Sequence, residues 1–167
     1  TTEERHHKSV QNLWNILEKK GEIYLSKYSG WYSVSDEAFY SDDEIKEKDG
    51  VKISSSSGSP VEWVEEESYF FRLSKWQDEL LKLYETNTDF ILPKSRKNEV
   101  VKFVEKGLKD LSISRTSFSW GIPVPKNNKH VIYVWLDALT NYLSALNFPN
   151  TEDEKYKSFW PVDIHII

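Results

Sequence analysis

The sequence contains no cysteine, and this absence excludes several kinds of site. Without thiols there is no disulfide framework, no thiol nucleophile, and no cysteine-ligated zinc or iron–sulfur centre. The composition suits the cytosol, so we expect a cytoplasmic protein. No apolar run approaches the roughly 18 residues that would span a bilayer, and the first residues do not resemble a secretory signal. We therefore expect no membrane partner.

Positive charge is also limited. The chain has 22 Lys and Arg against 27 Asp and Glu, which gives a formal net charge of −5. This balance argues against a strongly basic nucleic-acid clamp. Any contact with nucleic acid is expected to be local, because no overall positive field attracts the phosphates.

Glycine and proline are sparse, with six of each, whereas aromatic residues make up 14% of the chain. This composition is too apolar and too varied for a disordered or collagen-like protein. A length of 167 residues fits one domain, or one domain with part of another. The sequence therefore predicts a folded chain with a real core.

Both ends of the sequence suggest that it is an internal piece of a longer protein. The chain has no methionine and begins at Thr1. It closes on residues 162–167, an alternating-to-apolar run that predicts a strand and has no turn signal after it. We expect chemistry that is missing here to lie outside this segment.

The first twenty residues predict a helix. Thr1 and Glu4 have the spacing of a capping box, and residues 19–21, Lys-Lys-Gly, are a typical helix end. Apolar residues recur between them at helical spacing: Val10, Leu13, Trp14 and Leu17.

Two further helices are expected in the middle of the chain. Ser74 and Gln77 predict the cap of one helix. Residues 95–106 predict another, which Gly107 would end. Its buried face would carry Val100, Val101, Phe103 and Val104.

Strands are expected on either side of a polar segment. Residues 23–40 are rich in aromatic side chains and predict short strands, and residues 61–73 predict another. Residues 41–60 are acidic and then rich in serine and glycine, a composition that predicts a mobile loop or turn.

The clearest indication of an α/β fold comes near the end of the chain. Residues 131–135, Val-Ile-Tyr-Val-Trp, form an apolar run typical of a strand buried on both faces. Asp137 can cap a following helix. A second strand over residues 164–167 would complete a strand–helix–strand unit with a right-handed crossover.

A few polar residues are candidates for chemistry. Adjacent His6 and His7 point about 100° apart on a helix and cannot meet at one metal ion alone, so we favour a solvated helix face. The run of residues 65–67, three glutamates, is interpreted as a solvated strand edge. His165, in a predicted buried strand, is interpreted as a core histidine. The sequence shows no glycine-rich phosphate loop and no Ser/His/Asp arrangement that can be ordered.

Two adjacent segments resemble a known family. Residues 112–125, SISRTSFSWGIPVP, are similar to the segment with which several class I aminoacyl-tRNA synthetases return from their connective insertion to the nucleotide-binding core. Residues 133–142, YVWLDALTNY, resemble more narrowly the methionine-pocket strand and helix of the methionyl-tRNA synthetase family. Earlier segments are similar to the connective peptide region of that family: TTEERHHKSVQNLW, GWYSVSDEAFY and PVEWVEEESYFFRLSKWQDELLKLYE. The resemblance covers essentially the whole chain.

This resemblance implies a fold and a division into domains. A connective-peptide α/β insertion would be joined to a partial Rossmann-like class I catalytic core. Residues 1–20 would be a helix leading from the first half of the core. Residues 21–112 would be the connective peptide domain, and residues 113–167 part of the second half of the core.

The resemblance also implies the activity of a parent enzyme. That enzyme would activate methionine with ATP, in the presence of Mg, and transfer it to tRNA(Met) in translation. The two class I ATP signatures, of HIGH and KMSKS type, are not in this sequence, so we expect the isolated chain to be inactive. We also expect it to self-associate through its truncated strand.

Four residues are implied to lie in or near the active site. Trp135, Ala138 and Tyr142 would contribute to the methionine pocket, where a polarizable thioether gains from aromatic contact. Arg115 would lie close to the active site, where a guanidinium can pair with carboxylates. From the pattern alone, a plain core role for Trp135 and Tyr142 is the simpler interpretation. No catalytic residue is expected in this segment.

One departure from the family concerns metal. Many methionyl-tRNA synthetases have a zinc knuckle, and the matching positions here are Ser33, Asp36, Ser54 and Ser57. Three hydroxyls and one carboxylate are poor ligands for zinc. We therefore expect a knuckle without structural zinc, closed by turn hydrogen bonds and by packing of Trp31, Tyr32 and Phe39.

Two alternatives remain open from the sequence. A class I synthetase for Ile, Val or Leu shares the WGIPVP segment, although those enzymes have a larger editing insertion. A stand-alone, non-catalytic binding module with a synthetase-like fold is the other.

Overall fold

The computed structural model describes residues 2–36 and 38–166, and these form two compact units. The first unit combines Thr1–Tyr24 with Tyr69–Ile167, and the second is Leu25–Ser68. The unit limits fall inside two long strands, β1 (Ile23–Ser33) and β5 (Glu62–Phe71). Both belong to a four-stranded sheet with the order β2-β1-β5-β6.

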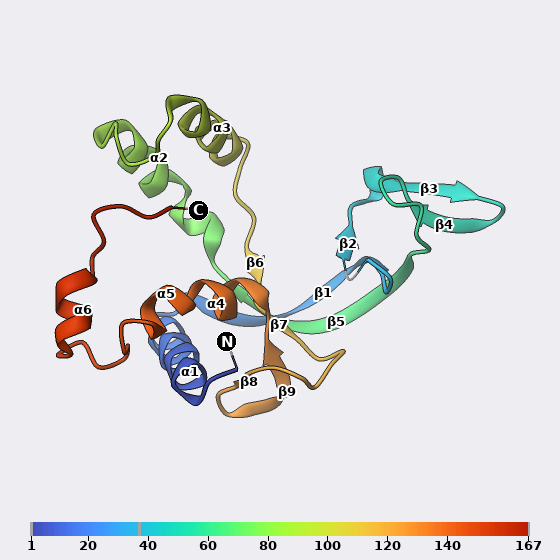
Figure 1. The fold of residues 1–167 in the computed structure, drawn as a ribbon. Coiled ribbons are helices and arrows are strands. Elements are labelled where there is room, and N and C mark those ends of the chain that lie inside the picture. Colours follow the sequence, from blue (N-terminus) through green and yellow to red (C-terminus); the bar gives the residue numbers. More distant parts are fainter. Residues whose placement is uncertain (1, 37, 167) are drawn as a thin grey trace. The chain divides into compact units, whose positions relative to one another are not determined.

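The first unit contains most of the helices (Figure 1). Its helical elements are α1 (Glu4–Lys19), η2 (Leu73–Trp76), α2 (Gln77–Thr86), α3 (Lys94–Glu105), α4 (Val134–Leu139), α5 (Asn141–Ser144) and α6 (Glu154–Phe159). Its short strands are β6 (Leu111–Ser112), β7 (Ser114–Arg115), β8 (Pro123–Val124) and β9 (Asn127–Ile132). Helices and strands thus occur together, as the sequence predicts.

Helix α1 follows the predicted pattern. Its apolar stripe buries Val10 and Trp14 completely. The helix ends where expected, with Gly21 in the left-handed region (φ +73°) and its N–H bonded to the carbonyl of Glu18. Thr1, the first residue of the expected capping box, lies outside the described residues, and the N-cap position is occupied by Glu3.

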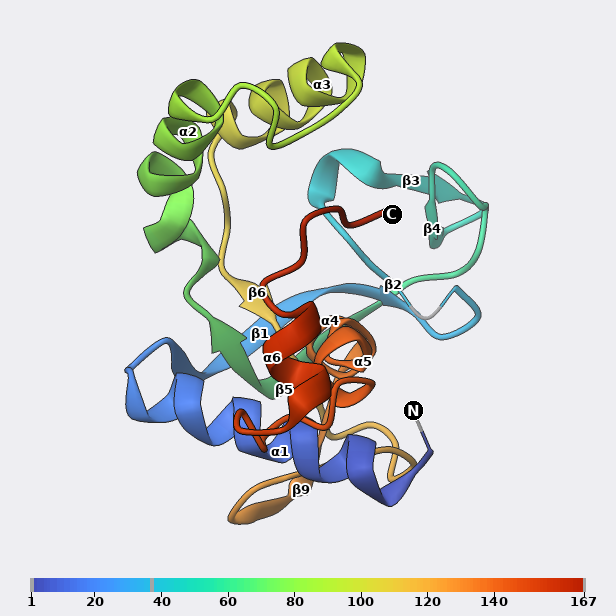
Figure 2. The same cartoon turned by 60° about the vertical axis from the view of Figure 1, so that its left-hand side comes forward.

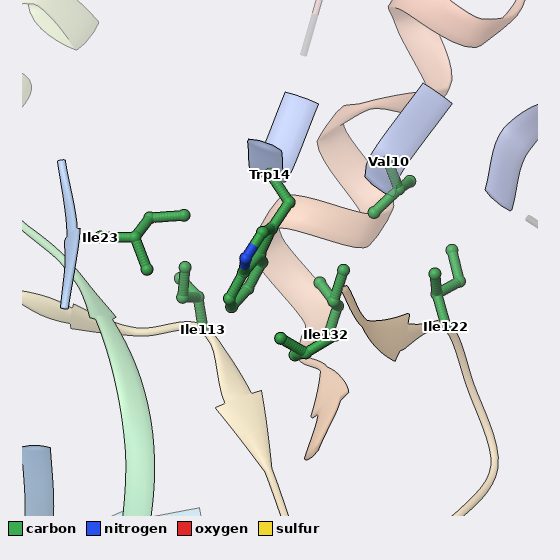
Figure 3. Close-up of a cluster of buried hydrophobic side chains, with 7 residues drawn as sticks. Val10, Trp14, Ile23, Ile113, Ile122 and Ile132 are labelled. Carbon is green, nitrogen blue, oxygen red and sulfur yellow. The ribbon is translucent and has the colours of Figure 1, made fainter. Parts of the chain in front are cut away.

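The core of the first unit forms where side chains of α1 cluster with residues of β1, β8 and β9 and with the residues that precede β7 and β8 (Figure 3). Its buried members are Val10, Trp14, Ile23, Ile113, Ile122, Val124 and Ile132. The ring of Trp14 also meets Tyr69 edge-on, with 5.1 Å between centroids. Apolar burial in this cluster is the main force holding α1 to the strands.

The predicted strand–helix–strand unit is wrong. Strand β9 ends at Ile132, pairs antiparallel with both β7 and β8, and gives way to α4 at Val134. Residues 164–166, the described part of the second predicted strand, form no strand, and Ile167 lies outside the described residues. An apolar run of five residues fits a strand or a buried helix equally well, and here the antiparallel partners end the strand early.

The two middle helices lie where the sequence predicts them, but the cap of α2 and the buried face of α3 differ from the prediction. Ser74 does not cap α2, whose N-cap position is Trp76. Instead, the N–H and hydroxyl of Ser74 donate to Asp110. Helix α3 matches the expected span within one residue, and Gly107 follows it at φ +101°. On its predicted buried face Val104 is buried, whereas Phe103 is exposed.

The second unit contains a hairpin that was not predicted from the sequence. Residues 41–60 were expected to be a mobile loop, but they contain η1 (Asp42–Glu44), β3 (Ile45–Lys48) and β4 (Val51–Ser54). Strands β3 and β4 pair antiparallel across a two-residue turn, Asp49-Gly50, with φ values of +53° and +77°. Asp-Gly is the preferred pair for this turn, so the signal was present in the sequence. The strand β2 (Ala38–Tyr40) pairs with the end of β1.

Candidate functional site

The proposed pocket residues lie on two short helices, α4 and α5. Strand β9 leads into α4 through Tyr133, which has an extended backbone (φ −98°, ψ 152°). Thr140 joins the helices as the C-cap of α4 and the N-cap of α5, and its buried hydroxyl donates to the carbonyl of Leu136 at 2.5 Å. Asp137 is inside α4, so its predicted role as a helix cap is wrong.

Trp135 is on the surface of α4 and not in a buried strand. Its side chain is 54% exposed, which is incompatible with a plain core role within this chain. Ala138, one helical turn further, is half-buried. Residues three apart on a helix share a face, so Trp135 and Ala138 can contact the same ligand.

Tyr142 lines a cavity of about 410 Å³ between α5 and the last described residues. His165 lies on the same cavity, and its ring meets the ring of Tyr142 edge-on at 4.2 Å between centroids. His165 is exposed and outside any strand, so its interpretation as a core histidine is wrong. Of the three predicted pocket residues, Tyr142 lines this cavity, whereas Trp135 and Ala138 lie on the preceding helix.

His6 is buried, so its predicted place on a solvated helix face is wrong. Its side chain is 3% exposed, and both ring nitrogens have partners. Nδ1 is 2.9 Å from the hydroxyl of Ser144, and Nε2 is 2.7 Å from a carboxylate oxygen of Asp137. The available signal was the spacing, because His6 precedes Val10 and Trp14 by four and eight residues on the apolar stripe of α1.

Arg115 lies on β7, directly beside the strand that leads into α4. Its Nη1 donates to the hydroxyl of Ser112 at 2.5 Å and to the carbonyl of Ser114 at 2.8 Å. The guanidinium carbon is 4.1 Å from the ring centre of Tyr133, a cation–π contact. These contacts hold a positive charge next to the start of α4.

The family model described as tRNA synthetases class I (M) matches residues 1–167. The chain belongs to this family. It is 58% identical to the methionine--tRNA ligases of Brucella suis and Rickettsia conorii over its whole length. The corresponding enzyme of Mycobacterium tuberculosis is 52% identical. In each comparison the chain spans about a third (32%) of the relative's length.

Solved structures of this class I synthetase family have the same fold. The M. tuberculosis methionyl-tRNA synthetase bound by methionyl-adenylate superposes with a TM-score of 0.87 at 52% identity. The match covers 99% of this chain and 33% of that one. The apo form of the same enzyme has a TM-score of 0.85. The α/β fold expected for a class I synthetase is thus confirmed.

The knuckle positions of the synthetase family come together in the second unit. The carboxylate of Asp36 accepts hydrogen bonds from the hydroxyls of Ser57 (2.5 Å), Ser59 (2.7 Å) and Tyr40 (2.7 Å). Ser54 and Ser57 are bonded to each other at 3.0 Å, and Ser33 accepts from the N–H of Asp36 at 3.3 Å. The expected turn hydrogen bonds are therefore present.

This hydroxyl network determines the charge state of Asp36. The hydrogen bonds from Ser57, then Ser59 and Tyr40, lower the pKa of its carboxyl to about 2. Every donor stabilises the ionised form, so Asp36 stays charged down to acidic pH. The expected aromatic packing is also present, with Tyr32 and Phe39 at 4.7 Å and Trp31 against Trp63 at 5.2 Å between centroids.

These knuckle residues do not fit zinc. Ser57 donates its hydroxyl to the single carboxylate, Asp36, whereas the hydroxyls of Ser33 and Ser54 are bonded to neighbouring serines. Neutral hydroxyls are also weak ligands for a zinc ion. Within the described ranges, no group of three or more His, Cys, Asp or Glu side chains could hold a metal ion.

The run of glutamates at residues 65–67 lies on β5. Glu65 and Glu67 are exposed on β5, and Glu65 pairs with Lys27 at 3.0 Å, which raises the lysine pKa. The solvated interpretation of this run is therefore confirmed for these two residues.

Among the described residues, no helix has the length and apolar character needed to cross a membrane.

Proposed function

We propose that this chain is part of a methionine--tRNA ligase. That enzyme activates methionine with ATP and Mg to form methionyl-adenylate, and then transfers the methionyl group to tRNA(Met) in translation. The observation that carries the proposal is identity of 52–58% to methionine--tRNA ligases along the full length of the chain. The adenylate-bound neighbour supports the use of ATP and methionine.

The share of this chain in the reaction is recognition of the amino-acid side chain. Trp135, Ala138 and Tyr142 form the methionine pocket, with the aromatic rings contacting the thioether. Two features support this role: the exposed ring of Trp135 on α4, and the position of Tyr142 at a cavity. Arg115 provides positive charge near the active site, from where it can pair with a carboxylate.

The proposed domain division follows the family. Residues 1–20 lead from the first half of the catalytic core, residues 21–112 form the connective peptide, and residues 113–167 belong to the second half. The ATP signatures lie outside these residues, so the isolated chain is inactive. The enzyme is cytoplasmic and has no structural zinc.

The two rival functions have less support. A synthetase for Ile, Val or Leu has less support because the relatives that are 58% identical to this chain are methionine--tRNA ligases. A stand-alone binding module has less support because the relatives that match the whole chain are ligases.

The test is Trp135→Ala in the full-length protein that carries this chain. Loss of one well-packed pocket contact costs roughly 10- to 200-fold in specificity, so the KM for methionine should rise by that order while the KM for ATP stays constant. Methionine-dependent ATP–pyrophosphate exchange measures both constants. The isolated chain should give only background exchange.

Trp63→Ala is the matched control, because Trp63 is equally exposed (55%) but lies in the second unit. It should leave both KM values unchanged. A folded Trp135→Ala protein with normal methionine KM would remove Trp135 from the pocket and weaken the case for Ala138 and Tyr142.

A further inference from the structure

The buried imidazole of His6 links three helices of the first unit. His6 is in the first turn of α1, yet its side chain is only 3% exposed. Figures 1 and 2 both show α5 beside α1, and His6 lies at this junction through its bonds to Ser144 and Asp137. With a partner on each ring nitrogen, the orientation of the imidazole is fixed.

The two partners of His6 are next to the proposed pocket residues in sequence. Asp137 lies in α4 between Trp135 and Ala138. Ser144 is the last residue of α5, two positions after Tyr142. One side chain from α1 thus contacts both helices that carry the pocket.

These helices need such an anchor, because they are too short to be stable alone. Helix α4 has six residues and α5 has four, well below the roughly 12–15 residues at which an isolated helix becomes even marginally stable. Their positions must come from tertiary contacts. Asp137 is only 21% exposed, so its carboxylate benefits strongly from a donor, which His6 Nε2–H supplies.

We propose that His6 is a positioning residue for the methionine pocket, holding α4 and α5 in the relative position at which Trp135, Ala138 and Tyr142 contact one ligand. The proposal rests on the proposed function, since it assumes that these three residues line the pocket. His6 itself does not touch the substrate. Its effect passes through Asp137 to α4 and through Ser144 to α5.

The experiment compares His6→Ala and His6→Gln in the full-length protein that carries this chain. Removing the imidazole should weaken methionine binding about tenfold, the order of effect of one lost charge-assisted hydrogen bond. ATP affinity should change less than twofold. The Gln side chain can place an amide N–H near the position of Nε2, so His6→Gln should recover most of the methionine affinity. Equilibrium dialysis measures the two affinities separately.

Ser9→Ala is the matched control. Ser9 is on the same buried side of α1, but its hydroxyl bonds the carbonyls of Arg5 and Phe148 and not the pocket helices. This variant should lower the melting temperature without changing methionine affinity. A merely structural role for His6 would lower the melting temperature of His6→Ala and either leave methionine affinity unchanged, as in Ser9→Ala, or weaken methionine and ATP binding equally. Either result would overturn the proposal.

Three further outcomes are decisive. If His6→Ala does not fold, Ser144→Ala replaces it, and normal methionine affinity in that variant would overturn the proposal. Failure of the proposed function is distinguishable, because Trp135→Ala would then leave methionine binding intact. A defect in Trp135→Ala together with normal binding in His6→Ala would reject only the role of His6.

Discussion

At the scale of single residues, Trp14 both stabilises the core and carries an energetic cost. It is fully buried in the cluster shown in Figure 3 and contacts the ring of Tyr69. However, its indole N–H has no hydrogen-bond partner among the described residues. A buried donor without a partner costs roughly 1–3 kcal/mol. The apolar contacts of Trp14 must exceed that cost.

The prediction at this scale compares two replacements of Trp14. Trp14→Ala should lower the free energy of unfolding by about 3–5 kcal/mol, because it leaves a large cavity. Trp14→Phe should cost less than half of that, since it keeps an aromatic ring and removes the unpaired donor. Urea denaturation of the chain measures both values.

The control for Trp14 is Trp120→Ala. Trp120 is exposed, and its loss should change stability by no more than about 0.5 kcal/mol. If Phe proved as damaging as Ala at position 14, the indole N–H would have a stabilising role that the structure does not indicate.

At the scale of elements, local turn chemistry explains the hairpin and the knuckle of the second unit. The Asp49-Gly50 turn sets the register of β3 and β4, in which Ile45 pairs with Ser54. Ser54 then begins the serine-rich turn that reaches Asp36. A segment with little apolar area is thus ordered by turn geometry and hydroxyl hydrogen bonds.

The prediction at this scale concerns the pH dependence of Asp36. Its pKa falls from 3.8 to about 2 in the folded state, so its contribution to stability is complete above about pH 4. As the pH falls from about 4 toward 2, the unfolded chain binds a proton that the folded chain does not. The contribution is then progressively lost.

Melting temperatures of the chain and of Asp36→Asn test this expectation. The difference between them should be largest near neutral pH and should shrink between pH 4 and 2. Asp49→Asn is the matched control, because it removes a carboxylate from the same hairpin and keeps a residue favoured in that turn. A difference for Asp36→Asn that is independent of pH in this window would contradict the hydroxyl network.

At the scale of the whole molecule, the described chain leaves apolar side chains uncovered near its last residues. Ile164 and Ile166 are 80% and 86% exposed, and Val162 is also exposed. The truncated strand expected there is absent from residues 164–166, so edge pairing of a preformed strand is not the route to association. Exposed apolar surface nevertheless favours contact between copies.

We expect the isolated chain to self-associate through these side chains. The double variant Ile164→Ser and Ile166→Ser should shift the mass measured by light scattering toward the monomer at the same concentration. Val34→Ser and Val51→Ser, at exposed valines of the second unit, are the control and should not shift it. A strictly monomeric starting chain at high concentration would reject this expectation.

Local patterns in the sequence determined those elements whose characteristic residues lie within a few positions of one another. The apolar spacing of Val10 and Trp14 predicted α1, and the Asp49-Gly50 pair would have predicted the hairpin. The resemblance of residues 133–142 indicated the family that the comparisons confirmed. These features depend on contacts between near neighbours in the chain, which sequence spacing records directly.

Only the tertiary structure decided the features that depend on distant partners. The run of residues 131–135 became the end of β9 and the start of α4 because β7 and β8 pair with β9 only as far as Ile132. His6 is buried because Asp137 and Ser144, more than 130 residues away, supply hydrogen bonds for both ring nitrogens. Burial of a polar group is stable only where such partners exist, and their positions come from the fold and not from local spacing.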